Sequence, residues 1–201
     1  MAPENAIIVA NNHALAKPAL GQFVDGYTLI VAREHFRAFG EMSYAELGFV
    51  EELKVHMCST LRLLYGKPVV IFEHGCGPKP NQRGGSCIDH AHLHLVPAAV
   101  SLKDDLAGRF RAKRLSTLAD LSRRDTMAGP YLYLETGDGE RFSFELDSEI
   151  PSQFMRRLIC RNIGRPDLWD WRIHPFRERI AEFTSAVLGM PATEIAGMAV
   201  R

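Results

Sequence analysis

The sequence predicts an α+β protein built around an antiparallel sheet packed with helices. Residues 130–136 and 141–146 alternate apolar and polar side chains on either side of a glycine-containing turn, which is typical of a β-hairpin. Residues 44–65 carry the apolar periodicity of one long helix. Strand-like and helix-like segments follow one another without the regular alternation of βαβ units, so we expect an antiparallel sheet rather than a parallel one.

Strands and a loop are expected before residue 33. Residues 6–10 (AIIVA) form a short apolar run typical of a strand, and a second extended piece is expected near residues 14–16. Residues 17–26 contain proline and glycine and predict a loop. Residues 27–32 (YTLIVA) are rich in β-branched and aromatic side chains, which favours another strand.

The helix predicted over residues 44–65 has clear signals at both ends. Ser43 and Glu46 form the S-x-x-E pattern of a capping box, which predicts its start. Gly66 predicts its end, because glycine readily adopts the left-handed conformation that closes a helix. One apolar stripe recurs at three- and four-residue steps and predicts the face toward the core: Leu47, Val50, Leu53, Met57, Leu61 and Leu64.

Further elements are expected along the rest of the chain. Residues 68–72 (PVVIF) predict a buried strand, and the Gly/Pro-rich residues 75–87 predict a loop that leads into a histidine-rich segment. Helices are expected at residues 102–110, in part of 109–124, from Pro151 to Gly164, and at 176–188, whereas 189–201 are weakly patterned.

The histidine-rich segment, residues 90–97 (HAHLHLVP), is the strongest functional signal. Its period of two is typical of a half-buried strand, which would place His90, His92 and His94 on one face, roughly 6–7 Å apart at their Cα atoms. Imidazole acts as a nucleophile near neutral pH and also ligates metals. From the residues alone, the segment is therefore compatible with attack on phosphorus or with a metal site.

Composition narrows the class of protein. The chain has 201 residues, of which 46% are hydrophobic, enough for one domain or one domain with an extension. Lys+Arg and Asp+Glu both number 24, and this balance argues against a binder of nucleic acid polymers. No apolar run is long enough for a membrane span, and no signal peptide is recognisable. The four cysteines show no CxxC spacing, so a soluble protein of a reducing cytoplasm is expected.

The pattern His-φ-His-φ-His-φ-φ at residues 90–96 resembles the signature of the histidine triad (HIT) superfamily of nucleotide hydrolases and transferases. Residues 84–87 (GGSC) stand where that family carries phosphate-contacting residues, and residues 27–35 look like its second conserved segment. Residues 73–75 with 88–92, and the segments 151–157 and 169–172, are similar to a bacterial subgroup related to diadenosine tetraphosphate hydrolases. The resemblance implies a HIT-like core at residues 1–110, with a hairpin-and-helix extension at residues 111–201 packed on it.

The resemblance implies a role for each histidine. His92 would attack the α-phosphorus of a nucleotide and form a covalent nucleotidyl-histidine, which then passes to water or to another acceptor. The carbonyl of His90 would hold the far ring nitrogen of His92, and His94 would contact the phosphate or the leaving oxygen. Other residues are expected to bind phosphate or substrate: Gly85, Ser86, Cys87, His74, Gln153, Trp171 and Arg172. The family resemblance also implies a homodimer, and we expect neither a metal nor another cofactor.

The sequence departs from the family pattern at three places. Residues 17–20 (KPAL) lack the acidic residue that often binds ribose, Tyr27 replaces a histidine, and Ala32 replaces a proline. Two alternatives therefore stay open. One is a metal-dependent hydrolase that uses the histidine face; a zinc site from Cys76, Cys87 and nearby histidines would match no standard spacing. The other is a HIT-fold nucleotide-binding protein with little turnover.

Overall fold

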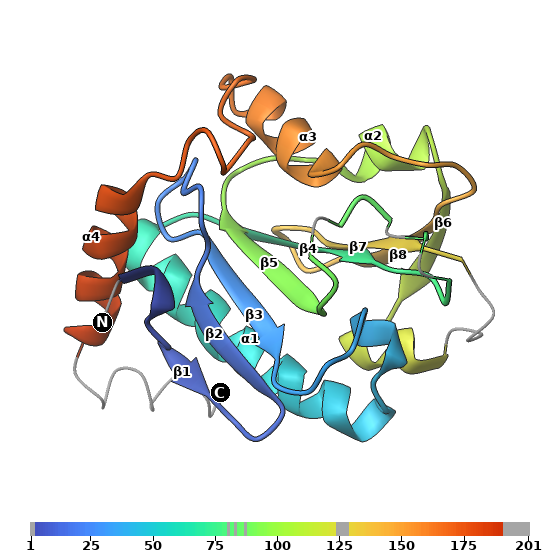
Figure 1. Ribbon diagram of the computed structural model, residues 1–201, viewed down its shortest axis with the longest axis horizontal. Coiled ribbons are helices and arrows are strands. Elements are labelled where there is room, and N and C mark those ends of the chain that lie inside the picture. Colours follow the sequence, from blue (N-terminus) through green and yellow to red (C-terminus); the bar gives the residue numbers. More distant parts are fainter. Residues whose placement is uncertain (1–2, 80, 83, 87, 124–128, 191–201) are drawn as a thin grey trace.

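The computed structural model describes residues 3–79, 81–82, 84–86, 88–123 and 129–190. The described chain is α+β, as predicted, with one antiparallel sheet in the order β1-β2-β3-β5-β4-β7-β8-β6 (Figure 1). The strands are β1 (Val9–Ala10), β2 (Ala14–Pro18), β3 (Thr28–Ala32), β4 (Val69–Gly75), β5 (His92–Pro97), β6 (Arg111–Leu115), β7 (Tyr131–Glu135) and β8 (Arg141–Glu145). The helices are α1 (Tyr44–Tyr65), α2 (Lys103–Ala107), α3 (Phe154–Asn162) and α4 (Arg177–Leu188).

Helices cover both faces of the sheet, which gives the protein two hydrophobic cores. One core joins α1 and α4 to the sheet through side chains such as Leu47, Phe183 and Leu93. The other joins α2 and α3 to the opposite face, where Leu106 and Ile159 share a cluster with strand residues. Figure 1 shows α2 and α3 together above the sheet, on the side away from α1. Central strands are therefore buried on both faces.

Helix α1 has the bounds that its sequence signals predict. The Ser43 side chain accepts a hydrogen bond from the Glu46 N–H, while the Glu46 carboxylate accepts one from the Ser43 N–H, so the capping box is complete. Gly66 ends the helix in the left-handed conformation at φ 61°. The buried face of α1 includes most of the predicted stripe and also Lys54, a charged residue that the apolar periodicity does not anticipate.

Lys54 belongs to a buried ion network between α1 and the sheet. Its ammonium group contacts the carboxylate of Glu135 on β7 and lies 2.8 Å from the carboxylate of Glu51. Arg141 donates from Nε to Glu135 over 3.0 Å, and the Tyr133 hydroxyl donates to the same carboxylate over 3.0 Å. Only 1% of Lys54 is exposed, so its charge is compensated by the carboxylates of Glu135 and Glu51 rather than by water.

Several predicted elements need correction. Residues 109–124 were expected to be partly α-helical, but Arg111–Leu115 forms strand β6, which pairs with β8, and only a 3-10 turn follows at Leu118–Arg123. Four exposed side chains on β6 hide its strand character, because an edge strand has no alternating apolar face to bury. The first strand is restricted to Val9–Ala10, and the helix expected at 102–110 is reduced to Lys103–Ala107. Most of the weakly patterned tail lies outside the described residues.

The predicted core, residues 1–110, and the predicted extension, residues 111–201, both contribute strands to the same sheet. Strand β7 pairs with β4 through a register that places Leu132 opposite His74, and β8 continues the sheet from β7. The predicted hairpin thus extends the sheet from β4, which separates it from the histidine strand β5. In the described part of the chain, no helix combines the length and apolar character needed to cross a membrane.

Candidate active site

Strand β5 carries His92 and His94 in the middle of the sheet. It lies between β3 and β4, and the register places both Leu29 and Phe72 opposite His94. Because side chains alternate along a strand, Leu93 and Leu95 point into the α1 core while the two histidines point toward α3. The segment was predicted to be half-buried; helices on both faces instead leave His92 8% and His94 9% exposed.

The His92 ring is oriented by the backbone of His90. Its Nδ1 lies 2.7 Å from the His90 carbonyl oxygen. A carbonyl can only accept, so Nδ1 carries the hydrogen and Nε2 of the neutral ring keeps its lone pair. Burial lowers the pKa of His92, although the bond to the His90 carbonyl opposes that shift. This geometry leaves Nε2 with its lone pair free on an uncharged ring.

The side chain of His90 points elsewhere. Its Nε2 lies 2.7 Å from the carbonyl oxygen of Ala32 at the end of β3, and its ring packs edge-on against His35. His90 precedes β5, which begins at His92, so it does not share the alternation of the other two histidines. The structure therefore connects His90 to the site through its backbone carbonyl.

His94 is held on several sides by rings. It stacks on Phe72 with ring centroids 4.2 Å apart, and it packs edge-on against His92 at 4.7 Å. Its Nδ1 forms a hydrogen bond of 2.6 Å with the hydroxyl of Tyr27, which is fully buried. Burial lowers the pKa of His94 well below its usual value. Tyr27 thus orients His94.

His74 adds a further imidazole from β4. It lies beside His94, with ring centroids 6.2 Å apart, and its Nε2 accepts a hydrogen bond of 3.3 Å from the Met155 N–H at the start of α3. Burial, followed by the charge of His92, lowers the pKa of His74 to about 3. His74 is therefore neutral at pH 7, with its hydrogen on Nδ1.

These side chains open into one cavity of about 160 Å³, here called the His92 cavity. Its wall comes from four parts of the chain: β2 and the loop after it, β3, the histidine strands, and the segment around α3. The lining residues are Lys17, Pro18, Ala19, Leu20, Tyr27, Leu29, His74, Gly85, Ser86, Ile88, His92, His94, Gln153, Arg156 and Trp171. The cavity thus combines histidines, two cationic side chains and apolar surface.

Arg156 contributes charge while it holds the wall together. Its guanidinium donates to the carbonyl oxygens of Trp169 at 2.7 Å, Gly21 at 3.0 Å and Leu20 at 3.4 Å. It also lies 5.1 Å from the centre of the Tyr27 ring. Gly21, at φ +69°, is required here because a Cβ would lie 2.5 Å from the Arg156 Nη2. The buried positive charge favours an anionic group in the cavity.

Gln153 is strained and incompletely hydrogen-bonded. It adopts a left-handed conformation at φ 60°, which is costly for a residue other than glycine. Its Nε2 donates to Asp170 over 3.4 Å, and among the described residues no group donates to its buried Oε1. Hydrogen bonds from Arg172 hold the pKa of Asp170 well below its usual range, so Asp170 stays a carboxylate and keeps the Gln153 amide in this orientation.

The structure brings most of the predicted site residues together. His92, His94, His74, Gly85, Ser86, Gln153 and Trp171 all line the His92 cavity. His90 reaches it through its carbonyl. Arg172 is not among the lining residues; its side chain is 63% exposed and pairs with Asp170. Cys87 lies outside the described residues.

Sequence reasoning missed several wall residues, including Tyr27, Lys17 and Arg156. Tyr27 had a signal, because the resemblance of its segment to HIT proteins predicts a histidine at this position. Arg156 had no signal that separates it from Arg157. Both lie in α3, yet Arg156 is buried, whereas Arg157 is exposed with its guanidinium over the Trp169 ring. Only the packing of α3 against the loop at Leu20 decides which arginine is buried.

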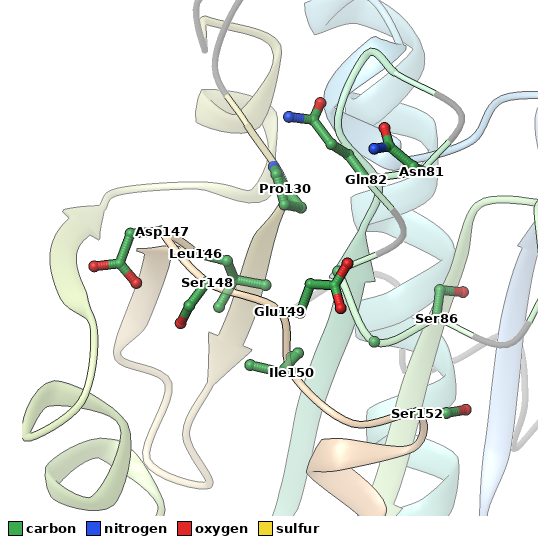
Figure 2. A pocket seen from close by; sticks show the side chains of 12 residues that line it. Asn81, Gln82, Ser86, Pro130, Leu146, Asp147, Ser148, Glu149, Ile150 and Ser152 are labelled. Atoms are coloured by element: carbon green, nitrogen blue, oxygen red, sulfur yellow. The ribbon is translucent and has the colours of Figure 1, made fainter.

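A second and larger cavity adjoins the first. It has a volume of about 550 Å³ and shares Gly85 and Ser86 with the His92 cavity. Half of its wall comes from the connection between β8 and α3 (Figure 2). It is here called the Glu149 cavity, and its lining residues are Asn81, Gln82, Gly84, Gly85, Ser86, Pro130, Leu146, Asp147, Ser148, Glu149, Ile150 and Ser152.

The arrangement of possible ligand side chains does not support a metal site in the described part of the chain. Within the described ranges, no three His, Cys, Asp or Glu residues are arranged to hold a metal ion. The ring nitrogens Nδ1 of His92, Nδ1 of His94 and Nε2 of His74 already have hydrogen-bond partners.

Comparisons with known proteins give a distant likeness. No protein-family model matches the chain. The chain aligns over 185 residues with CWF19-like protein 1 from Pongo abelii at 24% identity and from Homo sapiens at 23% identity. Each alignment covers 84% of this chain and 32% of the curated protein, so the chain spans about a third of the length of these relatives.

Among solved structures, the chain is similar to a Hit-like protein from Bartonella henselae described as involved in cell-cycle regulation. That similarity has a TM-score of 0.37 and 11% sequence identity, and it covers 46% of this chain and 66% of the other.

Proposed function

We propose that this chain is a HIT-fold nucleotide hydrolase or nucleotidyltransferase that acts at an α-phosphate through a covalent nucleotidyl-histidine on His92. The observation that carries the proposal is the hydrogen bond from His92 Nδ1 to the His90 carbonyl, because it leaves Nε2 as the nucleophile. The phosphate binds beside Lys17 and Arg156, whose charges suit an anion.

The reaction proceeds in two displacements. In the first, the Nε2 lone pair of His92 forms a bond to the α-phosphorus, and the bond from phosphorus to the leaving oxygen or nitrogen breaks. In the second, water or another acceptor attacks phosphorus and gives up its proton to the departed leaving group or to solvent. The bond to His92 breaks with its electron pair on Nε2, which restores the neutral ring. His94 contacts the phosphoryl or leaving oxygen, while Gly85 and Ser86 line the approach.

If the chain belonged to the bacterial subgroup related to diadenosine tetraphosphate hydrolases, its expected substrates would be dinucleoside polyphosphates. The curated proteins that align with this chain carry a different name, so the proposal stops at attack on an α-phosphate. A homodimer and a cytoplasmic location stay predictions from the sequence.

A trapped adduct tests the proposed reaction. Brief incubation with a nucleoside 5′-phosphate ester, followed by quenching and proteolysis, is expected to yield a peptide with a nucleotidyl group on His92, measured by mass spectrometry. Two displacements also retain configuration at a chiral α-phosphorothioate. Inversion of configuration, or an adduct on another residue, would contradict the mechanism.

The pH dependence of activity provides a second test. Protonation of Nε2 removes the lone pair, so kcat/KM should fall as the pH drops through the pKa of His92 in the free enzyme. Burial lowers that pKa from its usual value of 6.5, so we expect activity to persist below pH 6.5 before it declines. The measurement is kcat/KM against pH at constant ionic strength; an acid limb centred above pH 6.5 would show that His92 is not buried as described.

A binding protein with little turnover is the second candidate. It is favoured by the wall at residues 17–20, which offers lysine and apolar side chains where a family member often has an acid for ribose. Calorimetry with nucleoside monophosphates, run beside an assay of product, separates the candidates: binding without product favours this one.

A further inference from the structure

The His92 cavity and the Glu149 cavity are adjacent and share part of their walls. The His92 cavity, at about 160 Å³, is smaller than typical small-molecule pockets of roughly 300–1,000 Å³, whereas the Glu149 cavity falls within that range at about 550 Å³. Gly85 and Ser86 belong to both walls. A ligand held at His92 therefore has room to extend past this turn into the larger cavity.

Gly85 marks the point where the cavities approach each other. A Cβ at this position would lie 3.0 Å from Ile150, which lines the Glu149 cavity, and 3.2 Å from His74, which lines the His92 cavity. Its φ of +79° also excludes most side chains. The Gly85 carbonyl accepts a hydrogen bond of 3.1 Å from the Gln153 N–H. One connection, from β8 to α3, thus lines the larger cavity and ends at a residue of the smaller one.

The charges on the two sides have opposite signs. The His92 cavity contains Lys17 and Arg156, whereas the charged residues among the described lining of the Glu149 cavity are Asp147 and Glu149. Neither carboxylate pairs with a cation from the described part of the chain. Figure 2 shows the Glu149 side chain in the middle of this cavity, between Pro130 and Ser86, and Asp147 at its far end. Hydroxyl groups of Ser148 and Ser152 add to this polar wall.

We propose that the Glu149 cavity is the subsite for the leaving group, or for the acceptor that replaces it, and that it selects a group carrying an ammonium cation over one carrying further phosphates. This inference rests on the proposed function of His92. The substrate is then dipolar: its α-phosphate lies beside Arg156 and its cationic end lies beside Glu149. A polyphosphate leaving group would instead bring negative charge against two carboxylates.

A matched series of esters tests this selection. Nucleoside 5′-phosphate esters of tyramine, 4-ethylphenol and 3-(4-hydroxyphenyl)propanoate share a phenol leaving oxygen and differ in the charge at the far end. We expect kcat/KM to be about two- to fivefold higher for the cationic ester than for the neutral one, and lower by a similar factor for the anionic ester, as for a partly exposed ion pair. This spread should shrink at high salt.

Substitutions in the Glu149 cavity test whether its carboxylates cause the preference for the cationic ester. Glu149→Gln is expected to reduce the ratio between cationic and anionic esters more than Asp147→Asn does, because Glu149 lies nearer the shared turn (Figure 2). Glu52→Gln makes the same change in charge at an exposed position on α1 and should leave the ratio unchanged. The neutral ester serves as the internal reference for each variant.

The outcomes separate this inference from the proposed function. Turnover of all three esters at equal rates, or a preference that Glu149→Gln does not alter, would overturn the leaving-group subsite and leave the chemistry at His92 intact. Absence of turnover would contradict the enzyme proposal; the affinities of the same esters, measured by calorimetry, then decide the subsite, since equal affinities overturn it and tighter binding of the cationic ester supports it.

Discussion

Replacing His92 with asparagine is expected to lower kcat/KM for a nucleoside 5′-phosphate ester by a factor on the order of 10⁴–10⁶, as removal of an enzyme nucleophile does elsewhere. The reason is specific to the geometry: the His90 carbonyl and the ring hydrogen on Nδ1 direct Nε2 into the cavity, and asparagine has no equivalent lone pair on nitrogen. The measurement is steady-state turnover beside the unfolding transition of the same variant.

The matched control is His13→Asn. His13 lies between β1 and β2, stacks on Phe49 at 4.7 Å, and is not among the residues of either cavity. It should retain wild-type turnover. If His92→Asn folds and keeps full activity, covalent catalysis by His92 is wrong. Loss of activity in both variants to the same degree would instead point to a general effect on the fold.

Lys54→Met is expected to lower the free energy of unfolding by about 3 kcal/mol, at the low end of the range for breaking a buried ion pair. The substitution keeps most of the side-chain volume but leaves Glu135 buried without its ammonium partner, while Arg141 compensates part of the charge. Denaturant unfolding measures the loss. Lys67→Met, at an exposed position, should change stability by less than about 0.5 kcal/mol.

The same variant has a defined pH dependence. Burial raises the pKa of Glu135, but Lys54 and Arg141 outweigh it, so the folded pKa lies below the usual 4.5. A carboxylate with a depressed pKa stabilises the fold above its unfolded pKa and loses that contribution as the pH falls through the folded value. The difference between wild type and Lys54→Met should therefore be full above pH 4.5 and shrink below it. A difference that grows on acidification would contradict this assignment.

Local patterns anticipated the elements whose signals lie within a few residues. The capping box at Ser43 and Glu46 and the terminal Gly66 predicted the bounds of α1, and the alternation around residues 137–139 predicted the hairpin of β7 and β8. These predictions hold because the responsible interactions connect residues close in sequence. Strand β6 was not predicted, because this exposed edge strand carries no alternating apolar face.

The sequence by itself predicted that His90, His92 and His94 share one strand face, because alternation along a strand is a local property of the backbone. This prediction is correct for His92 and His94 and wrong for His90, which precedes β5. Only the tertiary structure decided what surrounds them. Pairing of β4 with β5 places His74 beside His94, and packing of α3 brings Gln153 and Arg156 to the same cavity. The acidic second cavity likewise depends on where the β8–α3 connection crosses the Gly85 turn. Such contacts join residues distant in sequence, and no local periodicity encodes them.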